Sequence, residues 1–174
     1  MDLFRNSLSV ESDAAKQLAE MRMKVNRAAE ISRQISHGLH VSSLVIGLPN
    51  ASESYCREFS KQRGIKADFT QQGSVRSLPE AVPLVMFRVL QEALNNVARH
   101  SGANQVEVSL LMQVGEVRLR VKDRGKGFDP MQTSDGLGLV SMRERLRLVG
   151  GTIRVSSAIG LGTELEAVVP FNPR

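Results

Sequence analysis

Residues 87–103, FRVLQEALNNVARHSGA, carry a pattern that one amphipathic helix explains. Their apolar side chains recur at steps of three and four, which places Phe87, Leu90, Leu94 and Val97 on one helical face. Ser101 and Gly102 follow the last apolar position and are expected to end the helix. The stretch therefore predicts a helix that packs one apolar stripe against a core.

The other face of this helix is polar and offers ligands for a metal ion. Its polar residues recur at steps of four, roughly opposite the apolar stripe: Arg88, Glu92, Asn96 and His100. The Glu92 carboxylate and the Asn96 amide oxygen, one turn apart, can share a hard cation such as Mg²⁺ with water and phosphate oxygens. Such a row is also the ordinary solvated face of a surface helix. Considered alone, the helix favours that plainer interpretation.

Three glycine-containing stretches downstream of the helix change this balance. They are Asp123-Arg-Gly-Lys-Gly127, Gly136-Leu-Gly-Leu139 and Gly160-Leu-Gly-Thr163. The first follows an alternating run that is typical of a strand, the second leads into a helical pattern, and the third opens a last alternating strand. Each glycine pair alone is weak evidence, because glycines mark ordinary turns. Their order after a Glu-x-x-x-Asn helix is much more specific.

Together these segments resemble the nucleotide-binding boxes of one ATPase superfamily, which includes histidine kinases, gyrase B subunits, MutL proteins and ninety-kilodalton heat-shock chaperones. The matching segments are Glu92…Asn96…His100, Asp123-x-Gly-x-Gly127, Gly136-x-Gly-Leu139 and Gly162-Thr163. Two features resemble sensor histidine kinases, in particular the nitrate/nitrite and membrane-fluidity sensors. They are the sequence motif Gln91-Glu-Ala-Leu-Asn-Asn-Val-x-x-His100 and the short interval between the glycine boxes. The resemblance covers roughly residues 30–170. It implies ATP and Mg²⁺ as cofactors.

The resemblance also assigns roles to residues of the boxes. Asp123 would read the adenine amino group, and Asn96 would be the magnesium ligand. Glu92 matches the residue that serves as general base in the hydrolysing members of the superfamily. In kinases, Glu92 would polarise a water molecule or contact the magnesium ion through one of its bound waters. The implied ATP-binding set is Asn96, Arg99, His100, Asp123, Gly125, Gly127, Gly136, Leu137, Gly138, Leu139, Gly162 and Thr163.

The chemistry of these residues agrees with such roles. A carboxylate at Asp123 can accept a hydrogen bond from an exocyclic amine, and it disfavours guanine, which presents a carbonyl at that place. Glycines permit close approach of the backbone to a base, and a helix that starts after Gly136 directs free amides at phosphate. Arg99, His100 and Lys126 can neutralise phosphate charge, and residues 128–135 are expected to form a short lid. The sequence contains no Gly-x-x-x-x-Gly-Lys-[Ser/Thr], so a P-loop mechanism is unsupported.

Composition sets the remaining limits. The 174 residues fit one domain, or one domain with a helical extension. The basic residues behind the net charge of +5 are spread along the chain, so a positive mouth for polyphosphate or a docking face for an acidic partner is favoured over nucleic-acid binding. The single Cys56 excludes an internal disulfide. No apolar run is long enough to span a bilayer, and the start of the chain lacks a signal-peptide layout. A cytoplasmic domain without membrane contact is expected, although a full-length protein could carry an anchor.

The first part of the chain predicts a separate helical segment, residues 1–48. Its apolar seam keeps three-and-four spacing at Leu18, Met21, Val25, Ala28, Ile31, Ile35 and Leu39. Periodicity leaves open whether this seam self-associates or packs on its own domain. The resemblance favours the second helix of a dimerisation bundle. The phosphoacceptor histidine would then precede Met1, and neither His37 nor His40 has the adjacent acid that an acceptor of this family carries.

Residues 49–174 predict the ATP-binding domain, a two-layer α/β sandwich with helices on one face of a mixed sheet. A helix capped by Asn50 or Ser52, with Glu53 in its first turn, is expected to run to Arg63 and to bury Tyr55, Cys56 and Phe59. Gly64 should end it. A strand over 65–70, a polar loop over 71–77, a helix with Pro79 in its first turn, a hairpin over 106–121, a helix over 139–149 and strands over 152–156 and 164–169 complete the domain.

The sequence thus predicts the ATP-binding catalytic core of a two-component sensor histidine kinase, which transfers the γ-phosphoryl group of ATP to a histidine outside this chain. The implied partners are a response-regulator receiver domain with a helix-turn-helix output and, in the full-length protein, a second copy of the chain. Two alternatives stay open: a non-catalytic nucleotide-binding or dimerisation module, and a serine kinase of the anti-sigma type.

Overall fold

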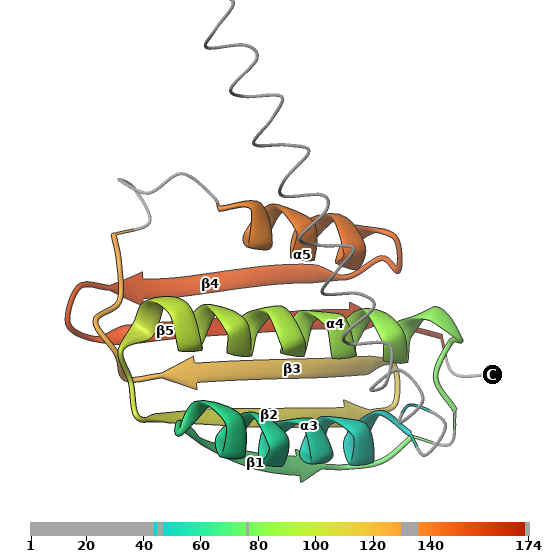
Figure 1. Cartoon of the computed structure of the whole chain (residues 1–174). Helices are drawn as coiled ribbons and strands as arrows, with labels where there is room; N and C mark the ends of the chain where they lie inside the picture. Colours follow the sequence, from blue (N-terminus) through green and yellow to red (C-terminus); the bar gives the residue numbers. More distant parts are fainter. Residues whose placement is uncertain (1–43, 45–46, 76, 130–135, 173–174) are drawn as a thin grey trace, which may run out of the picture. The chain divides into compact units, whose positions relative to one another are not determined.

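A single mixed sheet of five strands forms one layer of the protein, and three helices lie on one of its faces (Figure 1). The computed structural model describes residues 44, 47–75, 77–129 and 136–172. The chain divides into two units, residues 1–42 and 43–174, and every described residue belongs to the second. The predicted fold class of this part, an α/β sandwich with helices on one face, is confirmed.

The sheet combines one parallel and three antiparallel pairs in the order β1-β2-β3-β5-β4. The strands are β1 (Lys66–Gln72), β2 (Gln105–Gln113), β3 (Glu116–Asp123), β4 (Thr152–Ala158) and β5 (Gly162–Pro170). β1 and β2 are parallel because a helical crossover joins them, as parallel neighbours require. Strict alternation of buried and less buried side chains along β2 and β3 marks one face as the core face.

The helices are α3 (Leu48–Arg63), α4 (Ala81–Asn96) and α5 (Leu137–Arg147), and a five-residue π-helical turn, η2 (Val97–Ser101), continues α4. α4 lies between α3 and α5 over the middle of the sheet (Figure 1). Its predicted apolar stripe is fully buried at Phe87, Leu90 and Leu94. The ring of Tyr55 on α3 packs edge-on against Phe87, with centroids 5.7 Å apart. α4 is therefore the central element of the helical layer.

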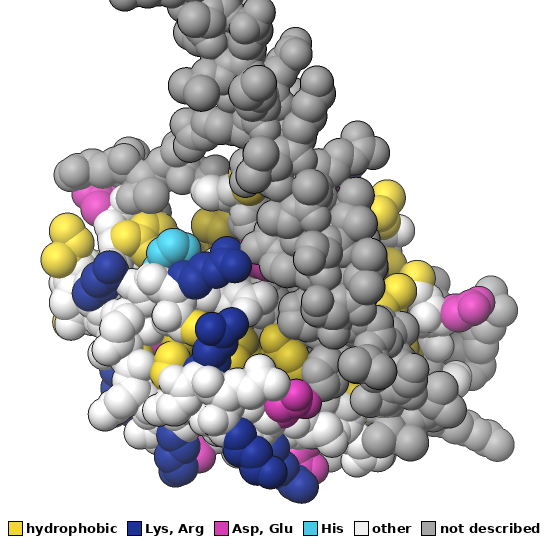
Figure 2. Space-filling model, in the orientation of Figure 1, with side chains coloured by type: hydrophobic (Ala, Val, Ile, Leu, Met, Phe, Trp, Pro, Cys, Tyr) yellow, Lys and Arg dark blue, Asp and Glu magenta, His cyan; other side chains and the backbone are white. Residues whose placement is uncertain are grey.

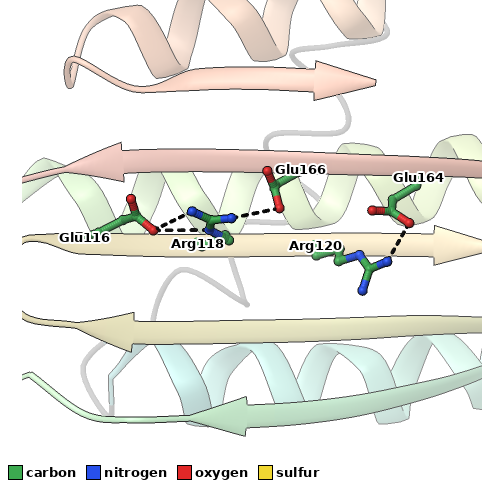
Figure 3. A network of polar contacts seen from close by, with 5 residues as sticks. All are labelled: Glu116, Arg118, Arg120, Glu164 and Glu166. Atoms are coloured by element: carbon green, nitrogen blue, oxygen red, sulfur yellow. Dashed lines mark hydrogen bonds and ion pairs between the residues drawn. The ribbon is translucent and has the colours of Figure 1, made fainter. Parts of the chain in front are cut away.

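The other face of the sheet carries a ladder of charged side chains, shown in Figure 3. Arg118 of β3 bonds Glu116 at 2.9 Å and crosses to Glu166 of β5 at 3.2 Å. Arg120 crosses to Glu164 at 2.6 Å. The hydrogen bond from Arg120 is the main cause that lowers the pKa of the Glu164 carboxyl. Cross-strand pairs of opposite charge support the pairing of β3 with β5 at its centre.

Several predicted boundaries were wrong by a few residues. α3 begins at Leu48 after Gly47, whose φ of 95° favours glycine, so neither Asn50 nor Ser52 is its cap and Glu53 is not in its first turn. A proline is tolerated in the first turn, where its missing N–H costs no intrahelical bond. The predicted burial of Tyr55, Cys56 and Phe59 is confirmed. Burial raises the pKa of the Cys56 thiol to about 12, which keeps it protonated and unreactive.

Three other elements also differ in extent from their prediction. β1 continues through residues 71–72, which were expected in a loop, because they pair with Leu110 and Leu111 of β2. α4 begins at Ala81 rather than around Pro79, which precedes the helix and accepts a hydrogen bond from the Val82 N–H. α5 begins two residues before the predicted 139. Of the predicted helical segment over residues 1–48, the structure describes residues 44, 47 and 48, and His37 and His40 lie outside the described residues.

Candidate functional site

Asp123 is the buried carboxylate at the centre of the candidate site. It is the last residue of β3, and only 4% of it is exposed. Its Oδ1 accepts a hydrogen bond from the Gly125 N–H at 2.8 Å, which fixes the orientation of the carboxylate. Among the described residues, no protein group donates to the second oxygen, Oδ2. The carboxylate is therefore held by its own loop while one oxygen stays available to a donor on a ligand.

The loop after Asp123 packs between the C-terminal end of the α4–η2 helix and the turn that joins β4 to β5. On the helical side, the Lys126 N–H donates to the Ser101 carbonyl at 2.8 Å. On the hairpin side, the Lys126 carbonyl accepts from the Gly160 N–H at 2.7 Å. A Cβ on Gly125 would lie 2.2 Å from the Ser101 carbonyl oxygen, and one on Gly127 would lie 2.0 Å from the Ala158 carbonyl oxygen. Both glycines thus permit close packing of the loop on protein backbone.

Thr163 and Gly162 lie directly beside Asp123 on the neighbouring strand. Asp123 pairs with Thr163 across β3 and β5. The backbone of Gly162 has a φ of 82°, and a Cβ there would lie 2.1 Å from the Asp123 carbonyl oxygen. The structure thus brings together five of the residues that were predicted to bind ATP: Asp123, Gly125, Gly127, Gly162 and Thr163.

A second group of predicted residues meets where α4 faces the start of α5. A Cβ on Gly138 would lie 2.3 Å from Oε1 of Glu92, so the carboxylate sits against the first turn of α5. Gly136 precedes α5, and its carbonyl accepts from the N–H groups of Leu139 and Val140. Within the described ranges, no side chain caps this helix end, which leaves its first amides free to bind an anion. Gly136 and Leu137 are exposed, and Leu139 is half-buried.

The polar row on α4 changes where the helix becomes a π-helical turn. Glu92 and Asn96 are half-buried on α4. Arg99 and His100 lie in η2 and are exposed. η2 is a π turn, which uses i→i+5 bonds in place of the i→i+4 bonds of the α-helix before it. The helix that carries the predicted polar row is thus α-helical up to Asn96 and π-helical from Val97 to Ser101.

The charge around the site suits an anionic ligand, but the described protein groups do not make a metal site by themselves. Figure 2 shows Lys and Arg side chains on the same face of the molecule as the described histidine. In the described part of the chain, no three or more His, Cys, Asp or Glu side chains gather to hold a metal ion. A cation here would need ligand oxygens in addition to the Glu92 carboxylate and the Asn96 amide. Residues 130–135 of the predicted lid are outside the described ranges.

Two serines that the motifs did not reveal join these parts. Ser101 holds the end of η2, where its hydroxyl donates to the Val97 carbonyl at 2.8 Å and accepts from the Ala103 N–H at 3.0 Å. Ser157 of β4 accepts from the Phe128 N–H at 2.9 Å and contacts Thr163 at 3.0 Å. For Ser157 a signal was available, because a hairpin that turns at residues 158–162 pairs it with Thr163.

This α/β sandwich, with a buried acid beside a glycine loop and an open helix N-terminus, defines a nucleotide-binding domain. The chain belongs to the family of histidine kinase-, DNA gyrase B- and HSP90-like ATPases, whose model matches residues 81–173. The predicted membership is confirmed, and ATP binding follows from it. No described helix is both long and apolar enough to cross a membrane.

Known relatives of the chain are sensor kinases. The signal transduction histidine-protein kinase/phosphatase DegS of Brevibacillus brevis is 31% identical over 161 residues, which cover 91% of this chain and 42% of DegS. The oxygen sensor histidine kinase NreB of Staphylococcus carnosus is 37% identical over 152 residues, 84% of this chain and 43% of NreB. The chain thus spans less than half the length of these relatives. The solved blue-light activated histidine kinase of Erythrobacter litoralis EL346 has a TM-score of 0.64 at 18% identity, over 83% of this chain and 49% of that one, and shares the fold.

Proposed function

We propose that this chain is the ATP-binding catalytic core of a two-component sensor histidine kinase. The observation that carries the proposal is the buried Asp123 carboxylate, held through Oδ1 by the Gly125 N–H. With Oδ2 available, it accepts a hydrogen bond from the exocyclic amine of adenine. Guanine would place a carbonyl oxygen against this carboxylate, and two facing acceptors leave both groups unpaired. Gly125, Gly127, Gly162 and Thr163 surround the base.

The triphosphate extends from Asp123 toward the start of α5. The free amides of Leu137 and Gly138, which follow Gly136, bind phosphate oxygens with the helix dipole behind them, and Leu139 closes this first turn through its N–H bond to the Gly136 carbonyl. Arg99, His100 and Lys126 add positive charge. Mg²⁺ binds to the amide oxygen of Asn96 and, through water, to Glu92, and its other ligands are phosphate oxygens and water. The half-buried position of both side chains on α4, with the Glu92 carboxylate against the first turn of α5, supports this role.

The reaction is transfer of the γ-phosphoryl group to a histidine, and it depends mainly on positioning and on charge stabilisation by Mg²⁺. Glu92 polarises the attacking group or holds a water of the metal shell. The acceptor is none of the chain's three histidines. His100 lies in the nucleotide site, and His37 and His40 lack the adjacent acid that would accept the ring proton.

The rest of the assembly follows from the same proposal. Residues 1–48 form part of a dimerisation bundle, and residues 49–174 form the catalytic domain. Two copies of the full-length protein associate, and the phosphoryl group passes to the receiver domain of a response regulator with a helix-turn-helix output. The domain works in the cytoplasm.

Nucleotide binding by Asp123→Asn tests the proposal. Calorimetry with Mg²⁺ should show that the 174-residue chain binds ATP and ADP and binds GTP little. Asp123→Asn should weaken ATP binding by about 10- to 100-fold, the range for a hydrogen bond to a charged group, without loss of fold. Asp68→Asn is the matched control, because Asp68 lies on the edge strand β1 and bonds Lys66 and Gln105. Equal affinity for GTP and ATP would contradict the assignment.

Phosphotransfer is tested separately with radiolabelled ATP. The chain should label a histidine acceptor domain supplied in trans and should not label itself. An acid-labile, base-stable label on His37 or His40 would show that the acceptor lies within the chain.

A further inference from the structure

The hydroxyl of Ser157 occupies a junction between the glycine loop and the β4–β5 hairpin. Its oxygen lies 2.9 Å from the backbone nitrogen of Phe128, 2.9 Å from the carbonyl oxygen of Gly162 and 3.0 Å from the hydroxyl oxygen of Thr163. Ser157 is half-buried on the side of β4 that faces the helices. A hydroxyl has one proton and two lone pairs, so these contacts use its full capacity.

The directions of these three hydrogen bonds follow from the chemistry of the partners. The Phe128 backbone nitrogen can only donate, so Ser157 accepts from it. The Gly162 carbonyl oxygen can only accept, so the Ser157 hydroxyl donates its single proton to that oxygen. No proton remains for the contact with Thr163, and Thr163 must therefore donate to Ser157. The Thr163 hydroxyl has thus used its proton and presents only lone pairs to any other group.

This polarity matters because Thr163 lies next to Asp123. Both are inward-facing residues, and they pair across β3 and β5, while Ser157 pairs with Thr163 across β4 and β5. The three side chains form a row on the helix-covered face of the sheet. If the base of a nucleotide lies against Asp123, as proposed above, it meets an acceptor on Asp123 and a second acceptor on Thr163.

We infer that Ser157 is a positioning residue for base selection, which holds the Thr163 hydroxyl in the acceptor state. This inference rests on the proposed function. A 6-aminopurine offers protons to this pair of acceptors. A 6-oxopurine offers an oxygen, which finds no proton on either side chain. Ser157 therefore strengthens the rejection of 6-oxopurines, although it need not touch the base.

The test compares the affinity of the 174-residue chain for ATP and ITP with Mg²⁺ by calorimetry. ITP replaces the 6-amino group by an oxygen and carries a proton on N1, and unlike GTP it adds no 2-amino group. Ser157→Ala releases the Thr163 proton, which can then turn toward the 6-oxo group. The ATP:ITP affinity ratio should fall by about 2- to 10-fold, the effect of one neutral hydrogen bond.

Three variants separate this effect from a loosened pocket. Ser157→Thr keeps the hydroxyl and should restore the wild-type ratio. Thr163→Val has no proton to release, so adding Ser157→Ala to it should leave its ratio unchanged. Ser157→Cys has nearly the shape of serine but only a weak donor and acceptor. Ser157→Cys should also lower the ATP:ITP affinity ratio. It replaces Ser157→Ala as the test variant if thermal melting shows that Ser157→Ala does not fold.

Two results would overturn the inference. One is a folded Ser157→Ala chain, or a folded Ser157→Cys chain in its place, with the wild-type ATP:ITP ratio. The other is that Ser157→Ala lowers the ATP:ITP affinity ratio by the same factor in the Thr163→Val chain as in the wild-type chain. This result would show that Ser157 acts only through the shape of the pocket. Failure of the proposed function looks different, because the wild-type chain itself would then show no preference for ATP, and the inference would fall with it.

Discussion

Gly138 offers a way to displace one side chain of the site without unfolding the domain. A Cβ at this position would lie 2.3 Å from Oε1 of Glu92, whereas ordinary contacts begin near 3.4 Å, so the carboxylate must move by about 1.1 Å, the difference between the two. The obstructing atom is the end of a flexible side chain, and the next atom, Cδ, is already 3.2 Å away. Gly138→Ala should therefore turn the carboxylate aside and leave the backbone in place.

The expected change in stability is small because two terms oppose each other. Alanine in place of glycine near the start of a helix stabilises it by up to about 1 kcal/mol. Turning Glu92 off its preferred rotamer costs about 0.5–1.5 kcal/mol. The free energy of unfolding should thus stay within about 1 kcal/mol of wild type. Displacing a reacting or polarising group by about 1 Å can lower a rate by about 100-fold, so phosphotransfer should fall by an order of magnitude or more.

The assay is phosphotransfer from ATP to a histidine acceptor domain supplied in trans, with thermal melting as the check on folding. Glu92→Ala provides the matched background, since it has no carboxylate for the new methyl group to displace. In that background Gly138→Ala should leave the remaining rate unchanged. The reasoning is refuted if Gly138→Ala alone keeps the wild-type rate, or if it slows the Glu92→Ala chain by the same factor as wild type.

Three further predictions concern the metal, the glycine loop and the charged ladder. Asn96→Ala should remove the Mg²⁺ dependence of ATP binding in calorimetric titrations with and without chelator, and a wild-type Mg²⁺ response would move the ligand role to Glu92. Gly125→Ala, whose Cβ would meet the Ser101 carbonyl oxygen at 2.2 Å, should lower the free energy of unfolding in urea by about 1–3 kcal/mol, and unchanged stability would contradict the close packing of the loop. Glu164 has a lowered pKa in the folded chain, so its stabilising effect is present above its ordinary pKa of 4.5 and is lost as pH falls through the folded value. Glu164→Gln should therefore melt below wild type at neutral pH and converge with it on acidification, and a constant difference would refute the role of Glu164 ionisation.

Local patterns in the sequence were enough to predict most of the elements. The apolar spacing of Phe87, Leu90 and Leu94 gave α4, and strict alternation gave β2 and β3, because burial on one face imposes these periods. The start of α3 was missed because Pro49 is compatible both with a break and with a first helical turn. The π-helical turn was missed because the apolar steps of three and four continue through Val97 without interruption.

The sequence predicted individual residues of the site, but it did not predict the hydrogen bonds that connect them. The sequence pointed to Asp123, Thr163 and the glycines one by one, through a resemblance in their order. It offered no reason to pick Ser101, since a lone serine at a helix end carries no pattern, and it indicated Ser157 only through the hairpin that pairs this residue with Thr163. Their importance depends on contacts between segments that are far apart in the chain, such as the bond from the Phe128 N–H to Ser157. Such contacts exist only once the sheet order is known.

The glycines themselves show why the motif is more demanding than a set of turns. Gly125 and Gly138 do not have a positive φ, so conformational freedom does not explain them. Gly125 is needed because a Cβ would strike the backbone of Ser101, and Gly138 because a Cβ would strike the Glu92 carboxylate. Among the glycines of the four boxes, Gly127 and Gly162 combine a positive φ with a close backbone neighbour. The same letter in the sequence therefore meets three different physical requirements, and alanine at each position should fail in a different assay: stability for Gly125, catalysis for Gly138, and folding itself for Gly127 and Gly162.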